Sequence, residues 1–221
     1  SSKMTYAQIA ALASIARERG ISIASHDDDS AEKLAFMDGL EASISEFPIS
    51  LDVAREARAR GLHTVAGAPN VMLGHSHSGN LSAREAVEAG AIDVLCSDYY
   101  PAALLDAVFT LRDECGLDIA RAFALVSVNP AKAAGIADEV GSLAVGKRAD
   151  VLLVREIACG EAGTRTMPVV TRAFVGGHSV FRSHYPDQPL GYARDLGERI
   201  DAARADAARA DAARALFPEA V

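Results

Sequence analysis

Two spacings of apolar residues alternate along the first 116 positions of the chain. Short runs in which most residues are apolar alternate with longer stretches in which apolar residues recur every three or four positions. The short runs are typical of buried strands, and the longer stretches are typical of helices that bury one face. Strands are expected at 21–25, 40–46, 63–68 and 91–97, and helices at 5–19, 27–40, 50–61, 81–90 and 101–116.

This alternation, with short connections, predicts βαβ units around a parallel sheet and therefore an α/β fold. Beyond residue 116 the pattern changes. A helical stretch at 118–136 is interrupted at Pro130, and strand patterns punctuated by glycine follow. The repeated DAARA sequence near the end predicts an exposed helix. Three regions are expected: an α/β part at 1–138, a small β segment at 139–182 and a helical tail at 183–221.

Ionisable residues follow each of the four expected strands. His26 follows the first strand, Glu46 ends the second, His77 lies in the segment after the third, and Asp98 follows the fourth. In parallel α/β sheets the carboxyl ends of the strands lie at one edge, and ligands bind there. We therefore expect these four side chains to converge on one site.

Imidazole and carboxylate groups together suit a divalent transition metal, and carboxylates can bridge two ions. We expect one or two metal ions held by His26, Glu46, His77 and Asp98, with zinc as the first candidate and manganese, iron or magnesium as alternatives. Such a metal acidifies bound water and polarises a phosphoryl or carbonyl oxygen. Asp98 is also the expected catalytic residue, because its carboxylate can take the proton of the attacking water.

The segment GAPNVMLGHSHSGN, at 67–80, has a composition typical of a loop. Its glycines allow the backbone to approach a ligand closely, and exposed amides in such a loop can hold phosphate oxygens. The expected substrate-binding residues are Asn70, Ser78, Gly79, Asn80 and, next to the catalytic aspartate, Tyr99. These features indicate a metal-assisted hydrolase, with a phosphorylated compound as a candidate substrate.

Composition narrows the partners. The net charge is −8 and no run of Lys or Arg stands out, which disfavours binding to nucleic acid or to an anionic membrane. No apolar run approaches the ~20 residues of a membrane span. The three cysteines are far apart and form no CxxC pair, so neither a disulfide framework nor a cysteine zinc site is expected. A reducing, cytoplasmic location fits this cysteine content best.

Several segments of the chain resemble the amidohydrolase superfamily. They are SHDD at 25–28, EFP at 46–48, the segment at 67–80, LCSDYYPAALL at 95–105, and NPAKAAGI and GSLAVGKRADVLLV within 129–154. The resemblance runs in order from about residue 5 to about residue 182. Within the superfamily, SHSGN followed by SDYYPA is similar to the PhnM-type diphosphatases of phosphonate metabolism, in the carbon–phosphorus lyase pathway.

The resemblance implies a distorted (β/α)₈ TIM barrel beside a small β-sandwich, with metal at the carboxyl ends of the strands. It implies hydrolysis of α-D-ribose 1-methylphosphonate 5-triphosphate to the 5-phosphate and pyrophosphate. His26 matches the family's metal-binding histidine after the fifth strand, and Asp98 matches the aspartate after the eighth. Glu46 stands where many members have a histidine after the sixth strand, and His77 falls after the seventh.

Only four βα units are present, and the superfamily's first-strand His-x-His or His-x-Asp pair does not occur before His26. The chain is therefore expected to be the second half of the barrel and to need the amino-terminal half as a partner. A half-barrel alone exposes apolar sheet edges, so a homo-oligomer is also expected. Two alternatives stay open: an amidohydrolase that cleaves a C–N bond in a cyclic amide or a base, and a non-catalytic fragment that lacks the first-strand ligands.

Overall fold

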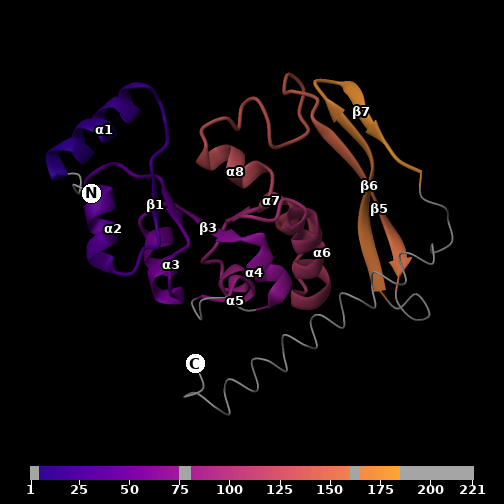
Figure 1. The fold of residues 1–221 in the computed structure, drawn as a ribbon, viewed down its shortest axis with the longest axis horizontal. Coiled ribbons are helices and arrows are strands. Elements are labelled where there is room, and N and C mark those ends of the chain that lie inside the picture. Colours follow the sequence, from indigo (N-terminus) through magenta and orange to yellow (C-terminus); the bar gives the residue numbers. More distant parts are fainter. Residues whose placement is uncertain (1–4, 75–80, 160–164, 185–221) are drawn as a thin grey trace, which may run out of the picture. The chain divides into compact units, whose positions relative to one another are not determined.

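The structure is a computed structural model that describes residues 5–74, 81–159 and 165–184. The chain divides into two compact units after Arg148 (Figure 1). Residues 139–148, which were expected to open the small β segment, belong to the first unit. The predicted helical tail lies outside the described residues, apart from its first two positions.

The sheet of the first unit contains the strands β1 (Ala24–His26), β2 (Ile44–Glu46), β3 (His63–Gly67) and β4 (Val94–Cys96). All neighbouring pairs are parallel, and the strands lie in chain order. This confirms the predicted α/β fold with a parallel sheet. The strands are shorter than predicted. β2 and β4 lie within their predicted ranges towards the carboxyl end, β3 ends one residue before its predicted end, and β1 extends one residue beyond its own.

The two faces of this sheet differ in burial, because alternate residues of a strand point to opposite faces. The register places Ser25, Ser45 and Thr64 side by side on one face, where all three are buried. On the other face, His26 of β1 is aligned with Glu46 of β2, and neither is buried. One face therefore lies in the core, and the other is open where β1 and β2 end.

The helices described in the first unit are α1 (Tyr6–Glu18), α2 (Ala31–Asp38), α3 (Leu51–Ala59), α4 (Ala68–Leu73), α5 (Ala83–Glu88), α6 (Ala103–Cys115), α7 (Ile119–Ala124) and α8 (Val128–Ala133). Three of them start at a serine whose hydroxyl accepts a hydrogen bond from a backbone N–H of the first turn: Ser30, Ser50 and Ser82. Each serine satisfies a donor that a helix start leaves free. None of the described helices is both long and apolar enough to cross a membrane.

Two predictions about helices are wrong. Residues 68–73 were expected in a loop but form helix α4, which tolerates Pro69 because the first turn of a helix does not need the missing N–H. The interruption expected at Pro130 lies at 125–127 instead, and this proline stands in the first turn of α8 for the same reason. In both cases a proline that suggested a break is located where a helix accepts it.

Helix α8 packs against the open face of the sheet at its β3–β4 end. Ala133 forms an apolar cluster with Val65 and Val94, and the cluster extends to Ile44 and Cys96. Helix α8 does not cover this face of the sheet at β1, where Ala24 and His26 are exposed.

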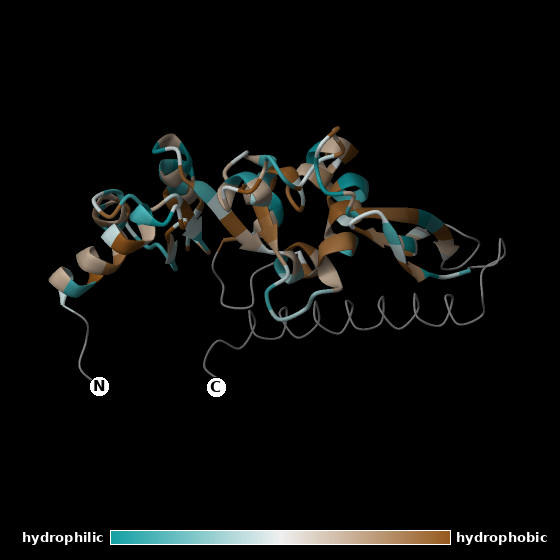
Figure 2. Cartoon of the chain, turned by 90° about the horizontal axis from the view of Figure 1, so that it is seen from above, coloured by the Kyte–Doolittle hydropathy of each residue, from teal (hydrophilic) through white to brown (hydrophobic). Residues whose placement is uncertain are grey.

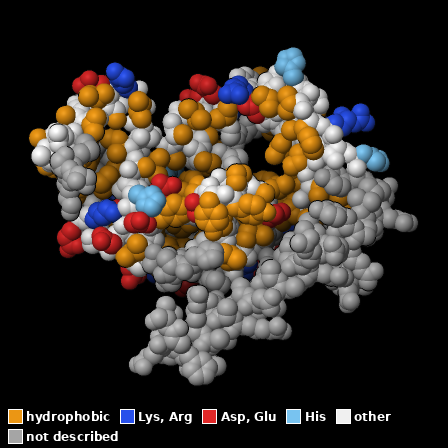
Figure 3. All heavy atoms as spheres, viewed as in Figure 1, with side chains coloured by type: hydrophobic (Ala, Val, Ile, Leu, Met, Phe, Trp, Pro, Cys, Tyr) orange, Lys and Arg blue, Asp and Glu red, His pale blue; other side chains and the backbone are white. Residues whose placement is uncertain are grey.

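Helix α1 buries none of its residues. Tyr6, Leu12 and Ile15 are exposed large apolar side chains on it, and Figure 3 shows hydrophobic side chains at the surface of this helix. The Tyr6 ring makes an edge-to-face contact with Phe36 of α2, with 5.8 Å between the ring centroids. Exposed apolar surface of this kind is typical of a face that another protein segment covers.

The second unit is an antiparallel sheet of β5 (Val151–Cys159), β6 (Arg165–Val175) and β7 (His178–Arg182). Strands β6 and β7 are joined at Gly176 and Gly177, which both have positive φ values that glycine adopts without strain. The paired strands within 164–182 were predicted. Figure 2 shows hydrophobic stretches along this sheet, where several large apolar side chains are exposed: Leu152, Leu153, Val175, Val180 and Phe181.

A buried carboxylate joins β1 to β2 in the first unit. The Asp28 side chain is 0% exposed, and its Oδ2 accepts hydrogen bonds from the hydroxyls of Ser25 and Ser45, both at 2.5 Å. Lys33 Nζ lies 3.5 Å from Asp28 Oδ1 and offsets its charge. Burial of a carboxylate is costly unless the group is paired and hydrogen-bonded. These contacts make Asp28 tolerable in the core and hold the ends of two strands together.

We predict that Asp28→Ala lowers the free energy of unfolding by about 3 kcal/mol, because it removes the acceptor that two buried hydroxyls share. Urea denaturation measures the change. Asp52→Ala is the matched control, because the Asp52 side chain on α3 is 96% exposed and its loss should change stability by less than about 0.5 kcal/mol. Equal stability of the two variants would contradict a structural role for the buried carboxylate.

Candidate active site

The loops that follow three of the strands contain residues in an unusual backbone conformation. Asp27 after β1, Phe47 after β2 and Asp98 after β4 have φ values of 53°, 55° and 49°. Residues other than glycine seldom adopt this left-handed region, and each instance costs on the order of 1 kcal/mol. Strain of this kind clusters at binding and catalytic sites. A binding or catalytic site is therefore expected at the edge of the sheet where the strands have their carboxyl ends.

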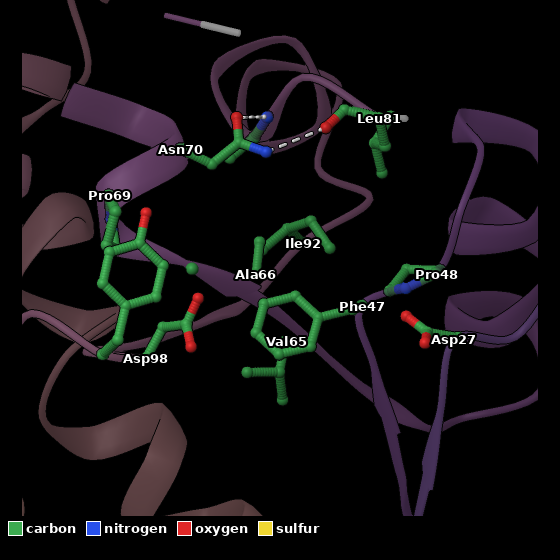
Figure 4. A pocket seen from close by; sticks show the side chains of 13 residues that line it. Asp27, Phe47, Pro48, Val65, Ala66, Pro69, Asn70, Leu81, Ile92 and Asp98 are labelled. Atoms are coloured by element: carbon green, nitrogen blue, oxygen red, sulfur yellow. Dashed lines mark hydrogen bonds between the residues drawn. The ribbon is translucent and has the colours of Figure 1, made fainter. Parts of the chain in front are cut away.

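A pocket of about 190 Å³ opens at this edge. Asp27, Phe47 and Asp98 all line it, and in Figure 4 the Phe47 ring lies between the Asp98 and Asp27 carboxylates. Most of the remaining wall is apolar or small: Pro48, Val65, Ala66, Gly67, Pro69, Asn70, Leu81, Ala83, Ile92 and Tyr99. Two exposed carboxylates thus line a pocket whose other walls are largely apolar.

Gly67 brings the loops of two other strands close together at the tip of β3. A Cβ added to this glycine would lie 3.4 Å from Phe47 Cε1 and 3.6 Å from Asp98 Oδ2. A larger side chain would fill the space between the ring and the carboxylate. The glycine therefore keeps one side of the Asp98 carboxylate accessible from the pocket.

His26, a predicted metal ligand, adjoins the pocket walls. Its Nδ1 lies 3.1 Å from Asp27 Oδ2, and its ring meets the Phe47 ring edge to face, with 5.2 Å between the centroids. More than half of the His26 side chain is exposed. The structure therefore brings this imidazole against two residues of the pocket that holds Asp98.

Glu46 and Asp98 both act on the thiol of Cys96 at the end of β4. Burial raises the pKa of Cys96, a hydrogen bond involving the backbone of Asp98 opposes this, and the charges of Glu46 and Asp98 raise it further. Glu46 is aligned with His26 in the sheet register. The charges of both predicted carboxylate ligands are therefore felt at one thiol.

The Asn70 amide lines the pocket but is engaged by the chain itself. Its Nδ2 donates to the carbonyl of Leu81 at 3.1 Å, and its Oδ1 accepts from the N–H of Ala83 at 3.0 Å (Figure 4). These bonds tie α4 to the start of α5. A substrate contact by Asn70 would have to use the remaining hydrogen-bonding capacity of the same amide, so its predicted role stays a prediction.

The other predicted substrate-binding residues divide into two groups. Tyr99 lines the pocket and is 69% exposed, so its hydroxyl is accessible. The remaining predicted residues, among them one predicted metal ligand, lie outside the described residues: His77, Ser78, Gly79 and Asn80. Their roles stay predictions.

Within the described ranges, no group of three or more His, Cys, Asp or Glu side chains lies close enough to hold a metal ion. The chemistry of the donors at the strand ends nevertheless fits a divalent cation, because an imidazole and three carboxylates are present there.

Two residues of this site were not predicted from the sequence. Asp27 was placed at the start of the predicted helix 27–40, and Phe47 was noted only as part of the EFP segment at 46–48. Both lie immediately after a strand, and that position was the available signal. Each of these residues has a left-handed backbone conformation, and each lines the pocket. Neither belongs to a sequence motif that is known to bind a ligand.

Comparison with known proteins identifies a family and two similar proteins. Residues 3–180 match the sequence pattern of the amidohydrolase family. The chain is 42% identical over 144 residues to the α-D-ribose 1-methylphosphonate 5-triphosphate diphosphatase of Escherichia coli K12, a match that covers 64% of this chain and 38% of that protein. It is 37% identical over 87 residues to the dihydroorotase of Methanopyrus kandleri, which covers 32% of this chain and 20% of that protein.

Solved structures share the fold at low sequence identity. An amidohydrolase from Thermotoga maritima matches with a TM-score of 0.58 at 17% identity, over 83% of this chain and 49% of that one. An adenosine deaminase from Xanthomonas campestris, solved with bound zinc, matches with a TM-score of 0.58 at 15% identity, over 90% of this chain and 55% of that one. The chain thus spans about half the length of these structures and less than half that of the curated relatives.

We predict that Cys115 resists alkylation at neutral pH. Burial and the neighbouring Glu88 raise the pKa of this thiol to about 11, so the reactive thiolate forms only as the pH rises towards that value. The measurement is the rate of iodoacetamide reaction between pH 7 and 9.5 in a variant that retains only this cysteine. The rate should climb throughout this range, and a plateau near pH 9 would contradict the prediction.

Proposed function

The chain belongs to the amidohydrolase family, and from this premise we propose that it forms the second half of a distorted (β/α)₈ barrel that hydrolyses a phosphoanhydride. The proposed reaction releases pyrophosphate from α-D-ribose 1-methylphosphonate 5-triphosphate, in the cytoplasm. The observation that carries the proposal is the pocket at the carboxyl edge of the sheet, which Asp27 and Asp98 both line. The 42% identity to the E. coli diphosphatase supports the choice of substrate.

The proposed barrel needs strands beyond the four described. β1 lies at the edge of the sheet, and the face that carries His26 and Glu46 is open beside it. A barrel of this type closes with eight strands. We propose that the amino-terminal half of the barrel covers this edge and completes the site. The exposed apolar side chains of α1 support the same idea, and self-association is the alternative way of covering them.

The proposed mechanism uses a divalent metal, with zinc as the first candidate, held by His26, Glu46, His77 and Asp98. When bound, such an ion supplies positive charge for the phosphoryl oxygens and acidifies water. The Asp98 carboxylate takes the proton of the water as its oxygen attacks phosphorus, and the bridging P–O bond breaks to release pyrophosphate. The exposed Tyr99 hydroxyl and the amides of residues 77–80 bind phosphate oxygens and orient the triphosphate.

A second candidate function is hydrolysis of a C–N bond. The described residues that line the pocket include no Lys or Arg, so none of them offers a cationic group to a phosphate. A less charged substrate fits such walls, and the match to a dihydroorotase points in the same direction. Parallel assays separate the two functions, because a phosphoanhydride substrate releases pyrophosphate and a cyclic amide or a base releases a carboxylate or ammonia.

We predict that Asp98→Asn lowers kcat for pyrophosphate release by about 10²–10⁴-fold, because an amide cannot accept the proton of the attacking water. The assay uses the chain together with the amino-terminal half that we propose it needs. Stability in urea should stay within about 0.5 kcal/mol of the wild type, since Asp98 is exposed and does not belong to the core.

The control for this experiment is Asp52→Asn, which makes the same chemical change at an exposed position of α3 and should leave kcat unchanged. Metal content is measured in every variant. Wild-type turnover by Asp98→Asn with normal metal content would overturn its role as the base. Less than one metal ion per wild-type chain, with no turnover, would favour a non-catalytic fragment.

A further inference from the structure

We propose that the ammonium group of Lys33 holds the backbone of Asp27 in its left-handed conformation and thereby keeps the Asp27 carboxylate in the wall of the pocket. Lys33 does not line this pocket itself, so it is a positioning residue that acts through Asp27. The inference rests on the proposed function, because it takes the pocket as the active site. It gives a role to a residue that the sequence patterns did not single out.

The Lys33 ammonium binds two consecutive carbonyl groups at the end of β1. Its Nζ donates to the carbonyl of His26 at 2.6 Å and to the carbonyl of Asp27 at 2.8 Å. Hydrogen bonds from a charged donor are stronger than those between neutral groups. The Lys33 side chain is 34% exposed, so protein atoms replace much of the water around it.

The two carbonyls together define the conformation of Asp27. One belongs to the peptide unit before the Cα atom of Asp27, and the other belongs to the unit after it. Because peptide units are planar, φ and ψ of Asp27 alone determine how these carbonyls are oriented to each other. In an extended strand successive carbonyls point in opposite directions and could not meet at one ammonium. The shared donor therefore selects the turn, in which φ of Asp27 is 53°.

The turn brings the Asp27 side chain to the pocket. The Asp27 N–H donates to the carbonyl of Glu46 at 2.9 Å, so this backbone is tied to β2 as well as to Lys33. Residues other than glycine keep a left-handed conformation only where the surrounding structure imposes it. Lys33 supplies this constraint from α2, and the Asp27 carboxylate lines the pocket as a result.

Neutralisation of Asp28 does not by itself account for the position of Lys33. Lys33 Nζ lies 3.5 Å from Asp28 Oδ1, which is farther than either carbonyl oxygen. Within the described part of the chain, this buried carboxylate oxygen has no hydrogen-bond partner. The ammonium thus offsets part of the Asp28 charge, while its hydrogen bonds go to the turn.

The stability of helix α2 does not account for Lys33 either. The residue stands in the first turn of the helix, where its N–H donates to the hydroxyl of Ser30 at 3.3 Å. A positive charge near a helix start is unfavourable, because the helix dipole is positive there. The two carbonyls of the turn therefore explain a lysine at this position better than the helix does.

The first test is hydrogen exchange at the Asp27 amide, followed by NMR. Lys33→Met keeps the length of the side chain and removes the ammonium. We expect exchange at Asp27 to become at least about tenfold faster, as for the loss of a bond to a charged donor. The Leu95 amide, which donates to the carbonyl of Leu125 at 2.8 Å, is the reference for unfolding of the whole unit. Lys132→Met makes the same change at an exposed position of α8 and should leave both rates unchanged.

The same comparison in an Asp28→Asn background separates the turn from the buried charge. Asparagine is uncharged and keeps an oxygen for the hydroxyls of Ser25 and Ser45, so loss of the ammonium leaves no buried charge unpaired and the chain should remain folded. A lysine that only offset the charge of Asp28 would have no effect there. We expect Lys33→Met to accelerate exchange at Asp27 in both backgrounds.

The second test is pyrophosphate release by the chain together with the proposed amino-terminal half. Lys33→Met should raise KM severalfold and change kcat less, because Asp27 lines the pocket whereas Asp98 takes the proton. A general loss of folded protein would instead lower kcat and leave KM unchanged. Lys132→Met is again the control and should change neither constant.

The outcomes separate the inference from the proposed function. An Asp27 amide that exchanges at the wild-type rate in Lys33→Met, or that accelerates only while Asp28 is ionised, would overturn the inference. A lower kcat with an unchanged KM would overturn it as well. Faster exchange in both backgrounds, in a wild type and variants that show no turnover, would support the positioning of Asp27 and defeat the diphosphatase function instead.

Discussion

The first unit depends on one buried charge. The Asp28 carboxylate lies in the core between the hydroxyls of Ser25 and Ser45, and these two residues belong to neighbouring strands of only three residues each. Strands this short make few backbone hydrogen bonds, so side-chain bonds carry a large share of their pairing. Lys33 couples the same carboxylate to the carbonyls of His26 and Asp27. The buried Asp28 carboxylate, which joins β1 to β2, is therefore linked through Lys33 to the turn at Asp27 that lines the pocket.

The position of the pocket follows from this architecture. Parallel strands end at one edge, so the residues that follow them gather there although they are far apart in the sequence. In this protein those residues turn sharply, and their side chains enter the pocket from β1, β2 and β4. The glycine at the end of β3 makes room for them. Carboxylates, an imidazole and an aromatic ring are brought together by the ends of the strands, and the interior of β3 adds Val65 and Ala66 to the wall.

Much of the fold could be predicted because each signal was local. Apolar spacing located every strand of the parallel sheet. It also located the helices whose first turns are capped by Ser30, Ser50 and Ser82. Asp98 could be placed in the site because it directly follows a strongly apolar strand. Helix α4 was missed because its glycine and proline suggested a loop, although both are acceptable at the start of a helix. Asp27 and Phe47 were missed because a left-handed turn depends on tertiary bonds, to Glu46 and Val65, which no local pattern encodes.

The left-handed residues of the pocket also bear on how this protein can be engineered. Glycine at position 27, 47 or 98 would relieve steric strain, so a search guided by thermal resistance alone would favour it. The same exchange would delete a carboxylate or an aromatic ring. Substitutions that raise thermal stability at these three positions would therefore remove side chains of the pocket. A more stable variant should carry its substitutions in α1 or in the antiparallel sheet instead.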